Sequence, residues 1–434
     1  MNQQHFNAFC QKLNGALSDD VIHGYAGETG FCQRKRQVSA RQLLLCLLTT
    51  MGYEKTESIA DIHRRFVEWT GEDIAYRAMH SQLSKASFPA FMREVLSHLL
   101  THWLEPVQVF GHDSPFSRFE QILLQDGSSF AVKDSLQGTY PGRFSTVSPA
   151  AVELHATMDL LADQACAISL TEDTASERDY LPEIEELDNS LLLVDRGYFD
   201  LDWFYRLNAG GGYFVARCLN DVNPVVEKAW SEQGKRLKFA TDQKLKTIQK
   251  RLLKHERTEL AVCWKLDAQK QFRGRLIAFW NAEEDRYSWL LTNLPRRDFS
   301  IGAVSDAYRL RWQVELLFKE WKSYANLHRF NTGNADLAEG LIWASIAAAV
   351  LKRFISQNAQ RLIGKALSTR RVAMSAASTM TQLMIGLLHD RRAGVRRLLK
   401  QLVEYLGKYA RRAHPKRDKK TGRSKLGLEA IGCA

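Results

Sequence analysis

Residues 308–322, YRLRWQVELLFKEWK, decide how the fold of this chain is interpreted. Their apolar side chains recur at the three- and four-residue spacing of a helix with one buried face. These side chains are Leu310, Val314, Leu317, Phe318 and Trp321. The segment therefore predicts a single amphipathic helix packed on a core.

A second face of the same helix is polar. Tyr308, Arg311, Glu315 and Lys322 are three, four and seven residues apart, which places them within an arc of about 60°. One carboxylate thus shares a face with three groups suited to phosphate. An ordinary Arg311–Glu315 ion pair on a surface helix is the alternative. Arg309, Gln313 and Glu320 lie on a third sector, which we expect to face solvent.

The composition is that of a globular protein. The chain has 434 residues, 45% hydrophobic and 25% charged, enough for several domains. It has no apolar run of 18 residues and no secretory signal at its beginning. Its seven cysteines show no metal-binding spacing, which favours reduced thiols. We expect a cytoplasmic protein with no membrane partner.

The charge indicates a polyanionic partner. The net charge is +11, and residues 391–434 hold 14 Lys and Arg against 3 Asp and Glu. Such an excess favours nucleic acid, with membrane surfaces and acidic proteins as competing partners. The stretch YARRAHPKRDKKTGRSK (409–425) is expected either to contact phosphates or to remain solvated.

The first 112 residues are predicted to be helical, as are those from 339 onward. ESIADIHRRF, the break WTGED and IAYRAMHSQLSKA resemble a helix-turn-helix unit. Its second helix would present Arg77, His80, Gln82 and Lys85 to DNA. A plain helical bundle is the alternative.

Two aspartates follow strand-like apolar runs in the middle of the chain. ILLQD ends at Asp126 and LLLVD ends at Asp195, and a glycine follows each closely. An ionised carboxylate at the end of a buried strand is costly unless it is paired. Each aspartate alone fits a turn or a helix cap. His155 and Asp159, on another predicted core strand, fit structural roles better than metal ligation.

Asp126, Asp195 and Glu315 together indicate a metal site. Three carboxylates form an oxygen-rich site suited to Mg²⁺, for which Mn²⁺ can substitute. Such ions support in-line phosphoryl displacement. Arg311 and Lys322 would hold DNA phosphates, and Tyr308 would donate a hydrogen bond to one. No phosphate-binding glycine loop is present, so no nucleotide cofactor is expected.

The same motifs carry a family resemblance. ILLQDGSSF, LLLVDRGYFD and the pattern Tyr308-x2-Arg311-x3-Glu315-x6-Lys322 resemble the three signature regions of bacterial DDE transposases of the insertion-sequence-four family. The helix pattern matches that family's YREK signature at all four positions. Ser128 stands where the family more commonly has threonine and keeps the hydroxyl. The likeness spans about residues 120 to 350.

The resemblance implies an α/β fold with a ribonuclease-H-like catalytic core, interrupted by a β-strand insertion and flanked by helical regions. The domains would be a DNA-binding domain (1–112), the core (113–204 and 293–338), the insertion (205–292) and a C-terminal helical region (339–434) suited to dimerisation.

It also implies a function. The triad Asp126, Asp195 and Glu315 would catalyse cut-and-paste transposition through a transposon-end hairpin. A homodimer would act on double-stranded DNA, at terminal repeats and target, in the bacterial nucleoid. Trp289, with Trp280 as the alternative, would stack on a flipped base. Arg196 would contact phosphate or only its own turn. A stand-alone Mg²⁺-dependent nuclease and a non-catalytic transposition inhibitor are the other readings.

Overall fold

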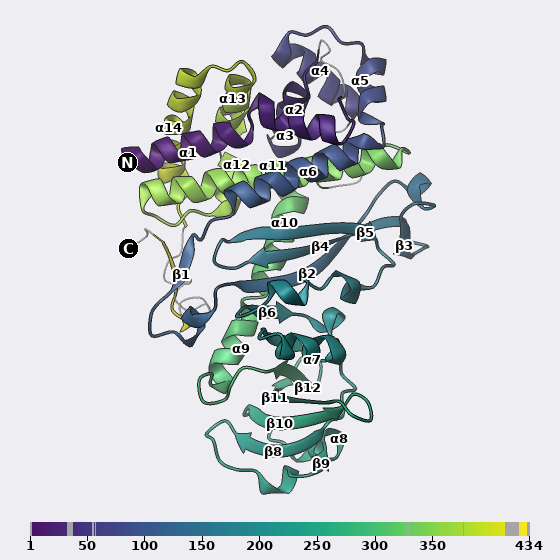
Figure 1. Cartoon of the computed structure of the whole chain (residues 1–434), viewed down its shortest axis with the longest axis vertical. Coiled ribbons are helices and arrows are strands. Elements are labelled where there is room, and N and C mark those ends of the chain that lie inside the picture. Colours follow the sequence, from purple (N-terminus) through teal and green to yellow (C-terminus); the bar gives the residue numbers. More distant parts are fainter. Residues whose placement is uncertain are drawn as a thin grey trace.

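A single large sheet runs through the middle of the molecule (Figure 1). The computed structural model describes residues 2–32, 38–53, 56, 58–325, 327, 330–375, 377–412 and 425–431. In these residues the sheet has eleven strands in the order β3-β4-β2-β6-β7-β12-β11-β10-β8-β9, with β5 paired to β4. It has parallel and antiparallel pairs, which confirms the predicted mixed α/β fold.

The first half of the sheet carries the two aspartates. β2 pairs antiparallel with β4 and parallel with β6, and β6 pairs parallel with β7. The run LLLV of β6 is buried on both faces, as expected for a parallel strand inside a sheet. The strands are β2 (Ile122–Ala131), β3 (Pro141–Phe144), β4 (Ser148–Asp159), β5 (Gln164–Glu172), β6 (Leu191–Val194) and β7 (Tyr213–Arg217).

The second half of the sheet is antiparallel. β12 pairs with β7, so these strands continue the same sheet instead of forming a separate one. The predicted boundary at residue 205 falls inside α7 (Leu201–Ala209), and β7 after it still runs parallel to β6. The strands are β8 (Val225–Ser231), β9 (Gln243–Lys244), β10 (Thr258–Lys265), β11 (Gln271–Asn281) and β12 (Arg286–Thr292), with α8 (Leu245–Ile248) beside them.

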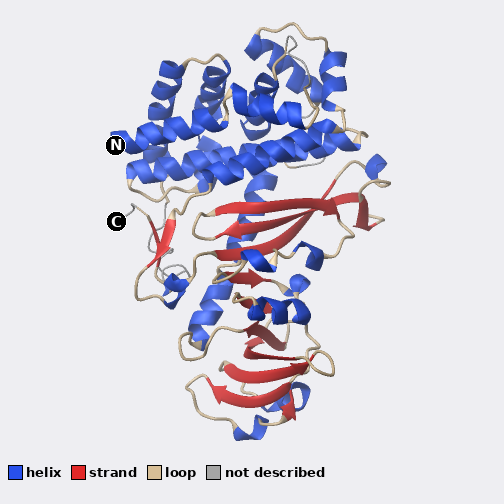
Figure 2. Ribbon diagram, viewed as in Figure 1, coloured by secondary structure: helices blue, strands red, loops and turns tan. Residues whose placement is uncertain are grey.

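The helices from the two ends of the chain pack together above the sheet (Figure 2). The long α11 contacts both α3 and α6, and α13 contacts α3. Buried Arg41 of α3 donates through Nη2 to the carbonyl oxygen of Leu387 on α13. Two segments distant in sequence therefore form one layer.

The helices of this layer are α1 (Gln3–Ala16), α2 (Asp19–Glu28), α3 (Ala40–Tyr53), α4 (Ile59–Thr70), α5 (Tyr76–Leu83), α6 (Ser87–Trp103), α11 (Ala335–Ile363), α12 (Thr369–Ser375), α13 (Ala377–Leu388) and α14 (Arg392–Tyr409). Beside the sheet, β1 (Gln108–Phe110) pairs with β13 (Leu428–Ala430). No described helix is both long and apolar enough to cross a bilayer.

The segment 308–322 forms two helices, so the prediction of a single helix is wrong. α9 (Ile301–Arg309) ends at Arg309, and α10 (Trp312–Tyr324) begins three residues later. Hydrogen bonds spanning three residues, such as that from Arg311 N to Tyr308 O, tighten the chain at the junction. Tyr308 therefore belongs to a different helix from Glu315 and Lys322.

The apolar face of α10 behaves as predicted. Val314, Leu317 and Trp321 are buried in the core cluster that also contains Leu124 and Leu193 of the sheet. Glu320, however, was expected to face solvent and is buried. It lies against Arg353 of α11, with 3.8 Å between Glu320 Oε2 and Arg353 Nη2. The partner comes from a helix distant in sequence, which the local spacing does not reveal.

Candidate active site

Strand register brings the two predicted aspartates together. In the parallel pair of β2 and β6, Gln125 is level with Val194, so Asp126 and Asp195 are the next residues along the two chains. Leu124 and Leu193, two residues before each aspartate, belong to the core cluster that α10 covers. Since side chains alternate along a strand, both carboxylates emerge on the face where α10 lies.

Asp126 does not end its strand, which corrects the prediction. β2 continues to Ala131 and stays paired with β4 over its whole second half. What ends near Asp126 is the pairing with β6. The gap left beside β2 exposes one edge of the strand, and the site is built there.

The residues of the helix pattern contact the aspartates directly. The hydroxyl of Tyr308 donates to Asp195 Oδ1 at 2.9 Å. Arg311 donates through Nη1 to Asp126 Oδ2 at 2.9 Å and through Nη2 to Glu315 Oε1. The three predicted acidic residues are thus brought together, one by each of β2, β6 and α10.

Lys322 holds the strand instead of a carboxylate. Its Nζ donates to Ser128 Oγ at 2.8 Å and to the carbonyl oxygen of Ser129 at 2.7 Å. Burial lowers the pKa of this ammonium group. Lys322 therefore ties α10 to β2 two residues beyond Asp126.

The electrostatics of the site disfavour its full negative charge. The pKa of Asp126 is raised to about 6, chiefly by burial; Arg311 lowers it, and the charges of Glu315 and Asp195 contribute to the rise. Burial also raises the pKa of Tyr308, and the charge of Asp195 adds to this. Tyr308 therefore acts as a neutral hydrogen-bond donor, and the cation of Arg311 favours the ionised form of Asp126.

Two further carboxylates, missed in the sequence, lie directly behind the aspartates. A side-chain carbon added to Gly127 would lie 2.6 Å from Glu153 Oε1, and one added to Gly197 would clash with Glu177 Oε2. Burial, together with the charge of Glu177, raises the pKa of Glu153 to about 7. The glycines after both aspartates thus make room for Glu153 and Glu177. A glutamate within the apolar strand VELHATM was the available signal.

The donor set of the three acidic residues suits a hard divalent cation. Among the described residues, no three acidic, histidine or cysteine side chains are grouped as they stand to hold a metal. The guanidinium of Arg311 lies between Asp126 and Glu315 and pairs with both. The carboxylate oxygens are ligands that such an ion prefers, and in this structure the guanidinium of Arg311 supplies the positive charge between two of the carboxylates.

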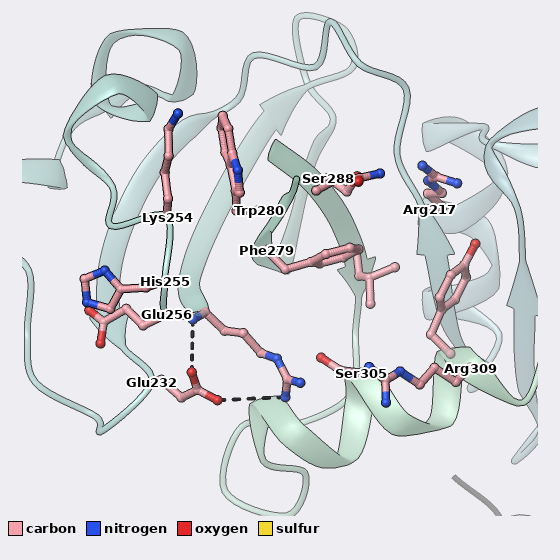
Figure 3. Close-up of a pocket in the computed structure, with 14 residues that line it drawn as sticks. Arg217, Glu232, Lys254, His255, Glu256, Phe279, Trp280, Ser288, Ser305 and Arg309 are labelled. Carbon is pink, nitrogen blue, oxygen red and sulfur yellow. Dashed lines mark hydrogen bonds and ion pairs between the residues drawn. The ribbon is translucent and has the colours of Figure 1, made fainter. Parts of the chain in front are cut away.

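A pocket of about 600 Å³ adjoins the site between β11, β12 and α9 (Figure 3). Tyr308, which bonds Asp195, is one of its lining residues. Arg217, Lys254 and Arg309 bring positive charge to it. The pocket thus lies on the antiparallel half of the sheet and shares Tyr308 with the carboxylate site.

The structure distinguishes the two candidate tryptophans. Trp289 is only 3% exposed and packs in the core of the antiparallel half, which disfavours it for base stacking. Trp280 lines the pocket, with Lys254 Nζ 3.7 Å from its ring centre (Figure 3). Arg196 begins the short turn after β6 and is partly exposed, so its predicted roles both stay open.

His155 and Asp159 have internal partners, as expected for structural residues. The ring nitrogens of His155 lie 3.0 Å from the Tyr198 hydroxyl and 3.2 Å from Thr171 Oγ1. Asp159 Oδ1 accepts hydrogen bonds from two backbone amides in the turn after β4. These hydrogen bonds agree with structural roles for both residues and give no support for metal binding by either one.

The second helix of the predicted helix-turn-helix unit is present as α5 (Tyr76–Leu83), after a left-handed Gly71 ends α4, and its contact with DNA stays a prediction. Arg77 is exposed on α5, and exposed Lys85 follows the end of that helix. Gln82 instead donates to the carbonyl oxygen of Phe31 at 2.6 Å, which gives it a structural contact. Most of the basic stretch 409–425, from 413 to 424, lies outside the described residues.

Residues 117–351, more than half of the chain, match the family model described as Transposase DDE domain. The matched region spans Asp126, Asp195 and Glu315. The chain belongs to this family.

Relatives agree with this assignment. The chain is 21% identical to the transposase for insertion sequence element IS231E of Bacillus thuringiensis subsp. finitimus, over 80% of each protein. It is 19% identical to the transposase for IS1151 of Clostridium perfringens, over 81% of each. Over 87 residues it is 37% identical to the putative transposase InsL for IS186A of Escherichia coli (strain K12), which covers 20% of this chain and 24% of that one.

Among solved structures, the piggyBac transposase synaptic complex with hairpin DNA aligns with a TM-score of 0.47 and 10% identity. The alignment covers 92% of this chain and 85% of that chain.

Proposed function

We propose that the protein is the transposase of an insertion sequence and uses Asp126, Asp195 and Glu315 as one catalytic triad. The convergence of these three carboxylates from β2, β6 and α10 is the observation that supports this most strongly. The matched family and the named relatives support the same function. The reaction proposed is cut-and-paste transposition in the bacterial cytoplasm.

The chemistry would be phosphoryl transfer assisted by Mg²⁺, with Mn²⁺ able to substitute. Asp126, Asp195 and Glu315 would hold the ion, which would activate the attacking oxygen and stabilise the leaving one. Tyr308 would orient Asp195 through its hydrogen bond. Lys322 would keep the Asp126 strand against α10, which fixes the spacing of the carboxylates.

The fold supports the finer architecture. Three antiparallel strands (β5, β4, β2) followed by two parallel ones (β6, β7) agree with the ribonuclease-H-like core that the motifs imply. The antiparallel strands β8 to β12 between Asp195 and Glu315 agree with the expected insertion. The helical layer would supply DNA binding and the contacts of a homodimer.

The pocket next to Tyr308 is where we place the DNA end. Its Arg217, Lys254 and Arg309 suit phosphates, and the ring of Trp280 offers a face for a flipped base in a hairpin intermediate. A base stacked on that face would displace Lys254 Nζ, which now lies over it. Trp280 thus replaces Trp289 as the proposed stacking residue.

The products of one reaction separate the candidate functions. Purified protein is incubated with a labelled duplex of the element's own end, a target plasmid and Mg²⁺, and the products are resolved on a denaturing gel. A hairpin followed by joining to the plasmid is the expected result. Nicked product without joining would indicate a stand-alone nuclease instead. Specific binding without cleavage in either Mg²⁺ or Mn²⁺ would indicate a transposition inhibitor.

A further inference from the structure

Arg311 occupies the centre of the carboxylate site. Its two terminal nitrogens bond Asp126 Oδ2 and Glu315 Oε1, and its side chain is only 13% exposed. The remaining carboxylate, Asp195, is bonded by the neutral hydroxyl of Tyr308. The guanidinium is therefore the positive charge that directly joins two of the three acidic residues.

One hydrogen-bond donor of the Arg311 side chain has no partner among the described residues. This donor is the Nε–H, which is buried. A buried donor without a partner is costly and calls for an explanation. Arg311 also stands at the junction of α9 and α10, where the backbone bonds span three residues instead of four. Besides a carboxylate, a guanidinium also binds a phosphate well, because the phosphate accepts two parallel hydrogen bonds from it.

A divalent cation and Arg311 cannot use the site in the same way. Both are positive, and the guanidinium already bonds Asp126 Oδ2 and Glu315 Oε1. A metal ion bound between these two carboxylates would be repelled by the guanidinium and would compete with it for those oxygens.

We propose that Arg311 is an internal counter-ion that blocks the metal site until DNA draws its guanidinium onto a phosphate. This inference rests on the proposed function, since it takes the triad as the metal site and DNA as the ligand. DNA binding would then strengthen metal binding, and metal would strengthen DNA binding by the same factor, because coupling between two ligands is reciprocal. In the absence of DNA, the protein would therefore not assemble a complete metal centre.

The test measures metal binding directly, without turnover. Free Mn²⁺ is titrated by electron paramagnetic resonance against the full chain, with and without a precleaved duplex of the element's end. For the unaltered protein we expect the duplex to tighten Mn²⁺ binding tenfold or more. Arg311→Met should bind Mn²⁺ at least tenfold more tightly than the unaltered protein without DNA, and the duplex should then tighten its binding by a clearly smaller factor than in the unaltered protein.

Two variants serve as controls. Arg206→Met also removes one positive charge, but from an exposed arginine that pairs with Asp202 on α7 instead of with the carboxylates of the site. It should keep the DNA dependence of Mn²⁺ binding. Glu315→Gln should lose tight Mn²⁺ binding with or without DNA. Unchanged Mn²⁺ binding in Glu315→Gln would contradict the proposed metal site itself, separately from the role of Arg311.

The inference is overturned if DNA leaves the Mn²⁺ affinity of the unaltered protein unchanged. It is also overturned if folded Arg311→Met binds Mn²⁺ no more tightly than the unaltered protein. Should Arg311→Met fail to fold, Arg311→Gln takes its place in the same titration.

Discussion

Replacing Asp126 with asparagine should make the metal-free protein more stable while abolishing catalysis. Burial raises the pKa of Asp126 from 3.8 to about 6, and its side chain is only 17% exposed. A rise of two pKa units corresponds to about 3 kcal/mol spent on ionising this group in the folded state at neutral pH. This cost is already net of the attraction of Arg311, which lowers the pKa of Asp126, and in the variant Arg311 keeps its bond to Glu315. The expected gain with asparagine is therefore about 3 kcal/mol at neutral pH.

The sign of the pH dependence follows from linkage. Between about pH 4 and 6, the folded protein holds more protons on Asp126 than the unfolded chain does, so the stability that this group contributes falls as the pH rises. The advantage of Asp126→Asn should therefore be large at pH 7.5 and shrink toward pH 4. Urea unfolding midpoints in EDTA, measured at both ends of this range, check it.

Asp306→Asn on α9 is the matched control, because Asp306 pairs with neighbouring Arg309 on its own helix instead of with a residue of the site, with 3.5 Å between Oδ1 and Nη1. It should change the free energy of unfolding by less than about 0.5 kcal/mol. The reasoning is refuted if Asp126→Asn is less stable than the unaltered protein at pH 7.5, or if its advantage grows toward low pH.

Three further substitutions test other parts of the structure. Glu259→Ala should lower the free energy of unfolding in urea by about 3 to 5 kcal/mol, because it leaves buried Arg275 without its ion pair. The control is Glu227→Ala, which breaks the exposed pair of Glu227 with Arg273 and should cost less than about 1 kcal/mol. Trp280→Ala should reduce hairpin formation at little cost in stability, whereas Trp289→Ala should cost about 3 to 5 kcal/mol; equal effects on stability would contradict their assignment. Lys322→Met should slow cleavage at least tenfold on a gel while DNA binding is kept, and unchanged cleavage would contradict its role in positioning β2.

Local patterns in the sequence were sufficient for much of the site. The spacing around Glu315 gave the buried face of α10, and the two apolar runs gave β2 and β6. The meeting of Asp126 with Asp195 depends on the register between those strands. Register is set by pairing along the whole sheet. The sequence could therefore suggest that Asp126 and Asp195 meet only when both strand motifs and the helix pattern around Glu315 were considered together.

Other features were hidden because they depend on distant partners. No glycine or proline marks the junction at Leu310 and Arg311, so the break between α9 and α10 left no local signal. Glu320 followed the polar spacing of an exposed residue, but Arg353 of α11 makes its burial tolerable. Arg311 was expected to bind phosphate, with an ion pair to Glu315 as the alternative; that pair is present, and the bond of Arg311 to Asp126 appears only in the folded chain.

The cleavage of an element-end duplex by Glu315→Gln tests the central claim most directly. Cleavage in Mg²⁺ and duplex affinity are measured side by side for the unaltered protein, for Glu315→Gln and for the control Asp306→Asn. If Asp126, Asp195 and Glu315 form one catalytic site, Glu315→Gln binds the duplex and does not cut it, while Asp306→Asn does both. Cleavage by Glu315→Gln at the rate of the unaltered protein would contradict the account.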